Sequence, residues 1–148
     1  MQPRETPIGL QLTHSSKVVS RAFGDALAAV GGSVPMWLIL TRLRGREWPA
    51  QLELARSVGI EGPTLTRHLD GLERAGLVVR RRDPENRRAV RVELTKAGEA
   101  RHDELREAVV AFDRRLRSSL TTDDLAQLRR LLGKLEANVS SAEEVRSA

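Results

Sequence analysis

Two adjacent segments of the chain carry side chains suited to binding a polyanion. Residues 62–74 have helical periodicity, and their leucines fall on one face. On and beside the opposite face lie Pro63, Thr64, Thr66 and Arg67. An arginine can donate to O6 and N7 of guanine together, and a threonine methyl can contact the methyl group of thymine. We therefore predict that Arg67 is the main base-reading residue and that Thr64 and Thr66 assist it.

The next segment is predicted to be an arginine-rich β-hairpin. Leu77–Val79 are β-formers, and after the polar loop 83–88 the chain alternates through Val90, Val92 and Leu94. The hairpin holds six arginines: Arg80, Arg81, Arg82, Arg87, Arg88 and Arg91. Like charges at this density repel one another unless an anion lies nearby, and we expect phosphate groups to be that anion. The loop arginines would suit a narrow minor groove, whereas the strand arginines would reach only phosphates or solvent.

The elements that must position these residues are helices. Apolar spacing and capping residues predict three of them before the base-reading helix, over 12–30, 33–45 and 51–58. Ser33 is the expected N-cap of the second helix, and a turn is expected through Trp48 and Pro49. The order is therefore helix, turn, helix, wing, which is typical of a winged helix-turn-helix domain.

Two further helices are predicted after the hairpin. Thr95 can cap the first, and Thr121 with Asp124 can open the second as a capping box. Apolar residues recur in the last helix at 125, 128, 132, 135 and 139, a stripe that requires a partner helix. The polar tail from Ser140 is expected to fray. The fold class is therefore mainly α with a small β-hairpin wing.

The composition narrows the class of partner and the compartment. Lys and Arg number 25 against 20 Asp and Glu, and the resulting net charge of +5 favours an acidic partner. The chain contains no cysteine, which excludes disulfides and thiolate chemistry. No apolar run has the length of a membrane span or of a signal peptide, so we expect a cytoplasmic protein.

No motif in the sequence indicates catalysis. The three histidines, His14, His68 and His102, form no metalloprotease pattern, and neither a nucleophile elbow nor a Gly-rich phosphate loop occurs. We expect no enzyme, no catalytic residue, no cofactor and no assigned metal ligand. Two alternatives stay open: a metal-responsive regulator whose ligands come from distant segments, and a helical protein-interaction module, which leaves the arginine-rich hairpin without a purpose.

The helix and hairpin residues form one joined pattern. It consists of Leu54-Ala55-Arg56, Gly59-Ile60, Pro63-Thr64-Leu65-Thr66-Arg67, Leu69-Asp70, Leu72-Glu73, Gly76-Leu77-Val78, Arg87-Arg88-Ala89 and Leu94-Thr95. This pattern resembles the MarR family of transcription regulators, and its SlyA-like branch in particular. The similarity extends from about Thr6 to Val139.

The resemblance implies one unit over 1–148. Residues 33–95 would form the winged helix-turn-helix DNA-binding region, and residues 6–32 and 96–140 a helical dimerisation region. The protein would be a homodimer, acting as a repressor on a pseudo-palindromic operator in double-stranded DNA.

The resemblance also assigns contacts on DNA. Facing major-groove bases would be Pro63, Thr64, Thr66 and Arg67. Arg88 would enter the minor groove, with Arg87 beside it. Family members often have an Asp two residues before the wing arginine, and here that position is Asn86, which can accept a hydrogen bond but has no charge to orient Arg88.

Family members commonly bind small anionic or phenolic compounds in a crevice between the dimer helices and the winged domain. By position, His14, Lys17 and Trp37 would lie near that crevice, where a cation and an aromatic wall would suit an aromatic carboxylate. The ordinary alternative is that Trp37 belongs to the core and the other two to the solvated surface. A regulator that senses no ligand therefore stays open.

Overall fold

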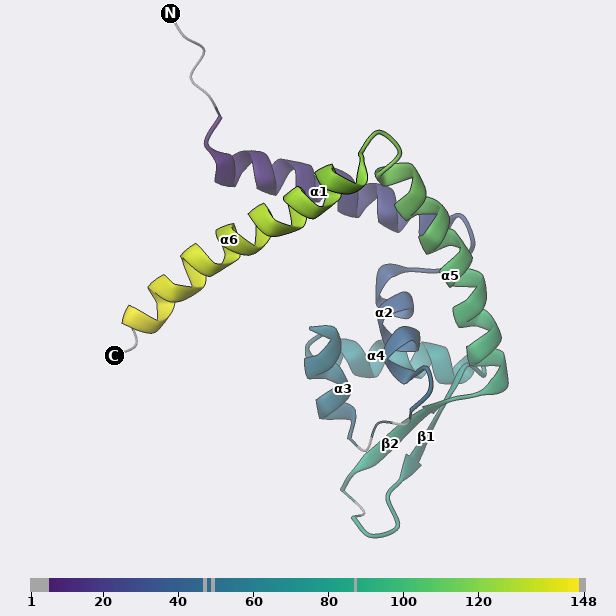
Figure 1. Ribbon diagram of the computed structural model, residues 1–148. Helices are drawn as coiled ribbons and strands as arrows, with labels where there is room; N and C mark the ends of the chain where they lie inside the picture. The colour runs from purple at the N-terminus through teal and green to yellow at the C-terminus, as the bar shows by residue number, and fades with distance from the viewer. Residues whose placement is uncertain (1–5, 47, 49, 87, 147–148) are drawn as a thin grey trace, which may run out of the picture. The chain divides into compact units, whose positions relative to one another are not determined.

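The computed structural model describes residues 6–46, 48, 50–86 and 88–146, with side chains up to residue 140 (Figure 1). The chain divides into two compact units, 1–112 and 113–148, which we describe separately. The elements are α1 (Ile8–Ala28), α2 (Val34–Leu43), α3 (Gln51–Val58), α4 (Gly62–Arg74), β1 (Val78–Arg82), β2 (Val90–Leu94), α5 (Lys96–Leu116) and α6 (Thr122–Arg146). In the described residues, six helices and one antiparallel hairpin confirm the predicted mainly α fold with a β-hairpin wing.

The predicted caps begin two helices of the first unit. The Ser33 hydroxyl accepts a hydrogen bond from the backbone N of Met36 at 3.2 Å, at the start of α2. The Thr95 hydroxyl accepts one from the backbone N of Gly98 at 3.0 Å, at the start of α5. Each cap satisfies an amide that the first turn of a helix otherwise leaves without a partner.

An aliphatic core joins the helices and the hairpin of the first unit. Its most buried side chains come from α1 to α5 and from both strands, and each is at most 1 % exposed: Leu27, Ile39, Leu40, Leu43, Leu54, Leu65, Leu69, Val78, Val92 and Leu105. Full burial of one such side chain contributes roughly 1.5–3 kcal/mol. Because Leu65 and Leu69 commit the inner face of α4 to this core, the opposite face of α4 is left for other contacts.

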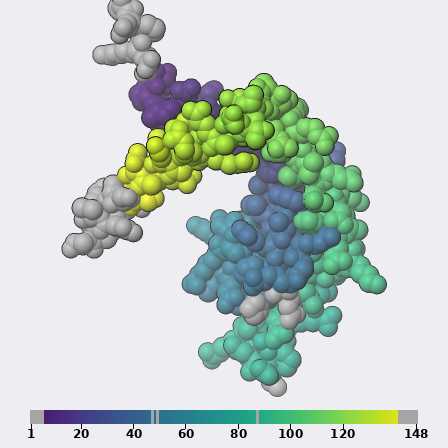
Figure 2. Space-filling model, viewed as in Figure 1, coloured from purple at the N-terminus to yellow at the C-terminus, as the bar shows by residue number. Residues whose placement is uncertain are grey.

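The hairpin projects beyond the body that α2, α3 and α4 form (Figures 1 and 2). Val78 pairs with Leu94 at its base, and Arg82 pairs with Val90 near its tip. Alternate residues of a strand share one face, so Arg80 lies on the same face of β1 as the buried Val78.

Trp48 makes a strand-like pairing that the sequence analysis missed. Its backbone N donates to the carbonyl of Val92 at 2.9 Å, and the backbone N of Val92 donates to the carbonyl of Trp48 at 3.0 Å. The indole Nε1 donates to the carbonyl of Arg42 at 2.8 Å. Trp48 therefore belongs to a β-bridge rather than a simple turn, and Pro49, the other residue of that expected turn, lies outside the described residues.

The second unit contains the end of α5 and all of α6. At the start of α6, the predicted capping box is present: the backbone N of Asp124 donates to Thr121 Oγ1 at 3.1 Å, and the backbone N of Thr121 donates to Asp124 Oδ2 at 2.8 Å. The tail that was expected to fray from Ser140 has a helical backbone to Arg146, and residues 147–148 lie outside the described part of the chain. Ala, Glu and Arg within 141–146 are good helix formers, which accounts for the extension.

The N-terminal helix is also longer than predicted at its start. It begins at Ile8 with Pro7 as the N-cap residue, four residues before the predicted start at Leu12, and ends at Ala28. A proline is tolerated here because its missing N–H would have no partner in the first turn. Over the part of the chain that the structure describes, none of the helices combines the length and apolar character that crossing a bilayer requires.

Candidate nucleic-acid interface

The outer face of α4 presents three of the four predicted base-reading residues to solvent. Pro63, Thr64 and Arg67 are exposed, whereas Leu65 and Leu69 are buried. Pro63 lies in the first turn of α4, where its fixed backbone angle suits a helix start. Arg67 is therefore held on a helix anchored in the core, with its guanidinium accessible. This is the geometry that reading a base edge requires.

Thr66 is half-buried, and its hydroxyl is engaged inside the fold. Its Oγ1 donates to the carbonyl of Gly62 at 3.0 Å and accepts from Nε2 of Gln51 at 2.8 Å. Gln51 is the first residue of α3, so this pair connects the starts of the two helices of the helix-turn-helix. The hydroxyl proton of Thr66 is therefore committed within the fold, and its methyl group and the second lone pair of Oγ1 are left for a base contact.

The loop of the hairpin is organised by two side chains that bond to its backbone. Asp83 Oδ1 accepts from the backbone N of Glu85 at 2.9 Å, and Asp83 Oδ2 accepts from Nε of Arg91 at 3.3 Å. The hydrogen bond from the Glu85 amide, together with Arg91, holds the pKa of Asp83 below its usual range, although desolvation acts in the opposite direction. Asn86 Oδ1 accepts from the backbone N of Arg88 at 3.2 Å. Asn86 thus shapes the loop that carries Arg88 through a main-chain contact.

The six hairpin arginines do not share one environment. Three have carboxylate partners within the protein: Arg80 with Asp70 and Glu73, Arg81 with Glu93, and Arg91 with Asp83. The expectation that strand arginines find only phosphate or solvent is therefore wrong for these three, because nearby carboxylates already balance them. Arg82 and Arg88 are exposed and make no ion pair within the described part of the chain, and Arg87 lies outside it. The free positive charge is concentrated toward the tip.

The end of α4, the base of the hairpin and the start of α5 meet at one junction. Thr95 Oγ1 donates to the carbonyl of Gly76 at 2.6 Å, and the backbone N of Thr95 donates to the carbonyl of Leu77 at 3.1 Å. Gly76 has a φ of 73°, a left-handed conformation that favours glycine. This junction fixes the C-terminal end of α4, the predicted recognition helix, relative to the root of the hairpin, the predicted wing.

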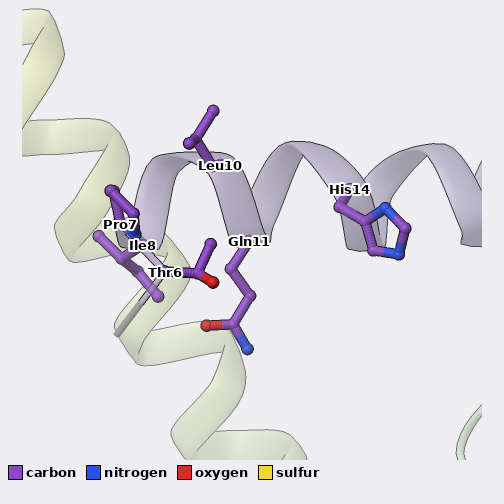
Figure 3. Close-up of a pocket in the computed structure, with 6 residues that line it drawn as sticks. All are labelled: Thr6, Pro7, Ile8, Leu10, Gln11 and His14. Carbon is purple, nitrogen blue, oxygen red and sulfur yellow. The ribbon is translucent and has the colours of Figure 1, made fainter. Parts of the chain in front are cut away.

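The three residues assigned to an effector site lie on two elements, α1 and α2. His14 is on α1, where it lines a hollow of about 890 Å³ with Thr6 and Gln11 (Figure 3). Figure 3 shows the side chains of Thr6 and Gln11 on the same side of α1. Lys17, one turn further along α1, is exposed. Trp37 on α2 instead stacks on His102 of α5, with ring centroids 5.1 Å apart and planes 18° apart.

His102 belongs to a polar cluster that the sequence analysis missed. It is 6 % exposed, and its Nδ1 lies 3.2 Å from Nη1 of Arg44. The same Nη1 donates to Asp103 Oδ1 at 2.8 Å, and this bond, more than the nearby His102, holds the pKa of Asp103 below its usual range. Nδ1 of His102 also lies 3.5 Å from Asp103 Oδ1, so its tautomer decides whether it accepts from Arg44 or donates to Asp103. Arg44 and His102 are 58 residues apart, so no local pattern signals this contact.

No group of three or more potential metal-ligating side chains occurs among the residues that the structure describes. The site is instead a helix with an accessible, partly basic outer face beside a hairpin whose exposed arginines gather near its tip. Together with the helical body, this arrangement defines a winged helix-turn-helix protein of the kind that regulates transcription.

Comparison with known proteins leads to the family. The family model described as MarR family matches residues 33–90. The transcriptional repressor CouR bound to a 23-mer DNA duplex is 28 % identical, with 88 % of this chain and 92 % of that chain covered and a TM-score of 0.79. A mutant of MarR from E. coli in complex with operator DNA is 27 % identical, with 87 % and 93 % covered and a TM-score of 0.76. The transcriptional regulator PA3341 is 33 % identical, with 91 % and 99 % covered and a TM-score of 0.73. The chain belongs to the MarR family of transcription regulators.

Proposed function

We propose that this protein is a homodimeric repressor that binds a pseudo-palindromic operator in double-stranded DNA. The observation that carries the proposal is the exposed face of α4 with Pro63, Thr64 and Arg67, next to a hairpin with exposed Arg82 and Arg88. Arg67 enters the major groove and discriminates bases, and Arg88 lies in the adjacent minor groove. Two similar structures contain DNA, which supports DNA binding. One of them, CouR, is itself a repressor, which supports repression rather than activation.

The dimeric state is supported by apolar side chains left exposed on the first and last helices. On α1 they are Ile8, Leu10, Leu12 and Val18, and on α6 they are Leu128, Leu131 and Val139. Ile8 and Leu10 are 62 % and 64 % exposed. Surfaces of this kind are stable in water when another subunit covers them. A two-fold dimer places two copies of α4 about one helical turn of DNA apart.

The same sequence pattern that joins the recognition helix to the wing supports a place in the SlyA-like branch. We further propose that an aromatic carboxylate releases the protein from DNA through His14, Lys17 and Trp37. The support is chemical: Lys17 offers an accessible cation, and Trp37 an aromatic wall. Benzoate is the simplest probe, and it should weaken operator binding by the wild-type protein and not by Lys17→Gln. Equal release of both proteins by benzoate would contradict the role of Lys17.

The operator is testable by selection from random duplex DNA with the full-length protein at near-physiological salt, where non-specific attraction is weak. We expect a palindromic motif with half-sites about ten base pairs apart. Binding that shows no motif and vanishes as salt rises would refute sequence-specific recognition and favour a protein-interaction module. The protein with Glu53→Gln, a change at an exposed position of α3, serves as a control that should recover the same motif.

A further inference from the structure

Arg80 differs from the other basic residues of the hairpin in its ion-pair partners, which lie on α4. Its Nη2 donates to Asp70 Oδ1 at 2.6 Å, and its Nε donates to Glu73 Oε2 at 2.6 Å. The Arg80 side chain is 21 % exposed, compared with 71 % for its neighbour Arg81. Asp70 and Glu73 are three residues apart on α4, so the two carboxylates present themselves side by side to one planar guanidinium.

The charge of Arg80 is fully balanced by these partners. Burial acts to lower the pKa of Arg80, but the bonds and charges of Asp70 and Glu73 outweigh it and raise the pKa above its usual value. Because two carboxylates already bond the Arg80 guanidinium, little of its charge is left to attract a DNA phosphate. Arg80 is therefore unsuited to the phosphate contact that its position in a basic hairpin suggests.

We propose that Arg80 is a positioning residue that clamps the wing to the recognition helix, and so allows Arg67 and Arg88 to engage one operator together. This inference rests on the proposed function. The clamp joins α4 one turn after Arg67 to β1 two residues before Arg82, where the strand leaves the body. Without it, the hairpin's remaining described contacts with α4 lie at its root, around Leu77 and Val78, and β2 keeps its bridge to Trp48.

Simple electrostatics and the clamp predict opposite changes in operator binding when Asp70 and Glu73 are neutralised. Neutralising Asp70 and Glu73 removes two negative charges from a protein of net charge +5 and should strengthen binding to any duplex. The clamp predicts the reverse for the operator: Asp70→Asn with Glu73→Gln frees the wing, so binding to the selected motif weakens. We expect the affinity ratio between the motif and a scrambled duplex to fall about tenfold, the effect of losing one good base contact.

Arg80→Lys separates the two roles further. It keeps the positive charge but loses the fork that bonds both carboxylates, so a phosphate contact would survive and the clamp would not. We expect Arg80→Lys to lower the affinity ratio as well. Partial unfolding reduces binding to both duplexes equally and leaves the ratio unchanged, so the ratio distinguishes positioning from a general loss of structure.

Glu93→Gln is the matched control. Glu93 pairs with Arg81 at 2.9 Å within the same hairpin and makes no ion pair with the described residues of α4. The Glu93→Gln substitution also removes one negative charge, and we expect it to leave the affinity ratio unchanged because exposed ion pairs contribute little.

Amide hydrogen exchange provides a readout that needs no DNA. In the full-length protein, Asp70→Asn with Glu73→Gln should speed exchange of the β1 amides about tenfold, since two charge-assisted hydrogen bonds are lost. Glu93→Gln should not do so. Unchanged exchange overturns the clamp, and faster exchange with an unchanged affinity ratio overturns its role in specificity. If the wild-type protein prefers no motif, the proposed function fails, while hydrogen exchange still decides whether Arg80 holds the wing.

Discussion

Gly98→Ala should destabilise the protein, although alanine is the better helix former. Gly98 lies in the first turn of α5, where the substitution alone would add up to about 1 kcal/mol of stability. A Cβ at this position would lie 2.0 Å from the carbonyl oxygen of Leu77 and 2.8 Å from Cδ2 of Leu94, whereas ordinary contact begins at 3.4 Å. The Leu94 side chain can move, but the Leu77 carbonyl is backbone and accepts from the N of Thr95. Relieving the clash requires α5 to shift from the root of the wing.

Overpacking of this kind costs roughly 1–3 kcal/mol or more, and a backbone clash falls at the upper end. We expect a net loss of about 2 kcal/mol, which lowers Tm by about 6 °C in a protein of this size. Thermal unfolding followed by circular dichroism at a fixed protein concentration measures it, since the Tm of a dimer depends on concentration. Gly71→Ala is the matched control, because a Cβ there meets nothing within 4 Å and Tm should rise by about 3 °C. An increase for both variants would show that the close approach at Gly98 has been misjudged.

Three further outcomes are expected. Arg67→Ala should cost about 1–3 kcal/mol of discrimination at one base position, measured by competition with single-base operator variants, and equal losses on all sequences would contradict base reading. The Thr121 amide and hydroxyl hold the pKa of Asp124 below its usual range, so the capping box contributes stability above about pH 4 that is lost as pH falls through the lower folded-state pKa. Asp124→Asn should therefore flatten the pH dependence of Tm below about pH 4, and an unchanged profile would refute this. Leu128→Gln should yield monomers in sedimentation that no longer bind the operator, and a monomer with full affinity would refute the dimer proposal.

Local patterns in the sequence predicted most of the helices and the hairpin. Leucines recurring at helical spacing marked the inner face of α4, and the structure buries Leu65 and Leu69 there. The capping roles of Ser33 and Thr95 also followed from short-range chemistry, because a cap bonds to an amide three residues away. Such features depend on neighbouring residues alone, so one sequence is sufficient to find them.

The candidate site was predicted less completely. Exposure of Pro63, Thr64 and Arg67 followed from the helical periodicity, but the bond from Gln51 to Thr66 did not. Gln51 belongs to another helix, and its contact depends on the angle at which α3 meets α4. Nothing in the spacing of polar residues encodes that angle, which packing of the leucine core sets.

The sequence by itself determined that a polar, basic helix face is followed by an arginine-rich hairpin, because residue type and periodicity are local properties. Only the tertiary structure decided which of those arginines carry free charge. Arg80 lies on the core-facing side of β1 and meets Asp70 and Glu73, whereas Arg82 and Arg88 project without ion pairs in the described residues. A charge pairs with whichever opposite charge the fold brings within a few ångströms, and that distance is set by how strand and helix pack together.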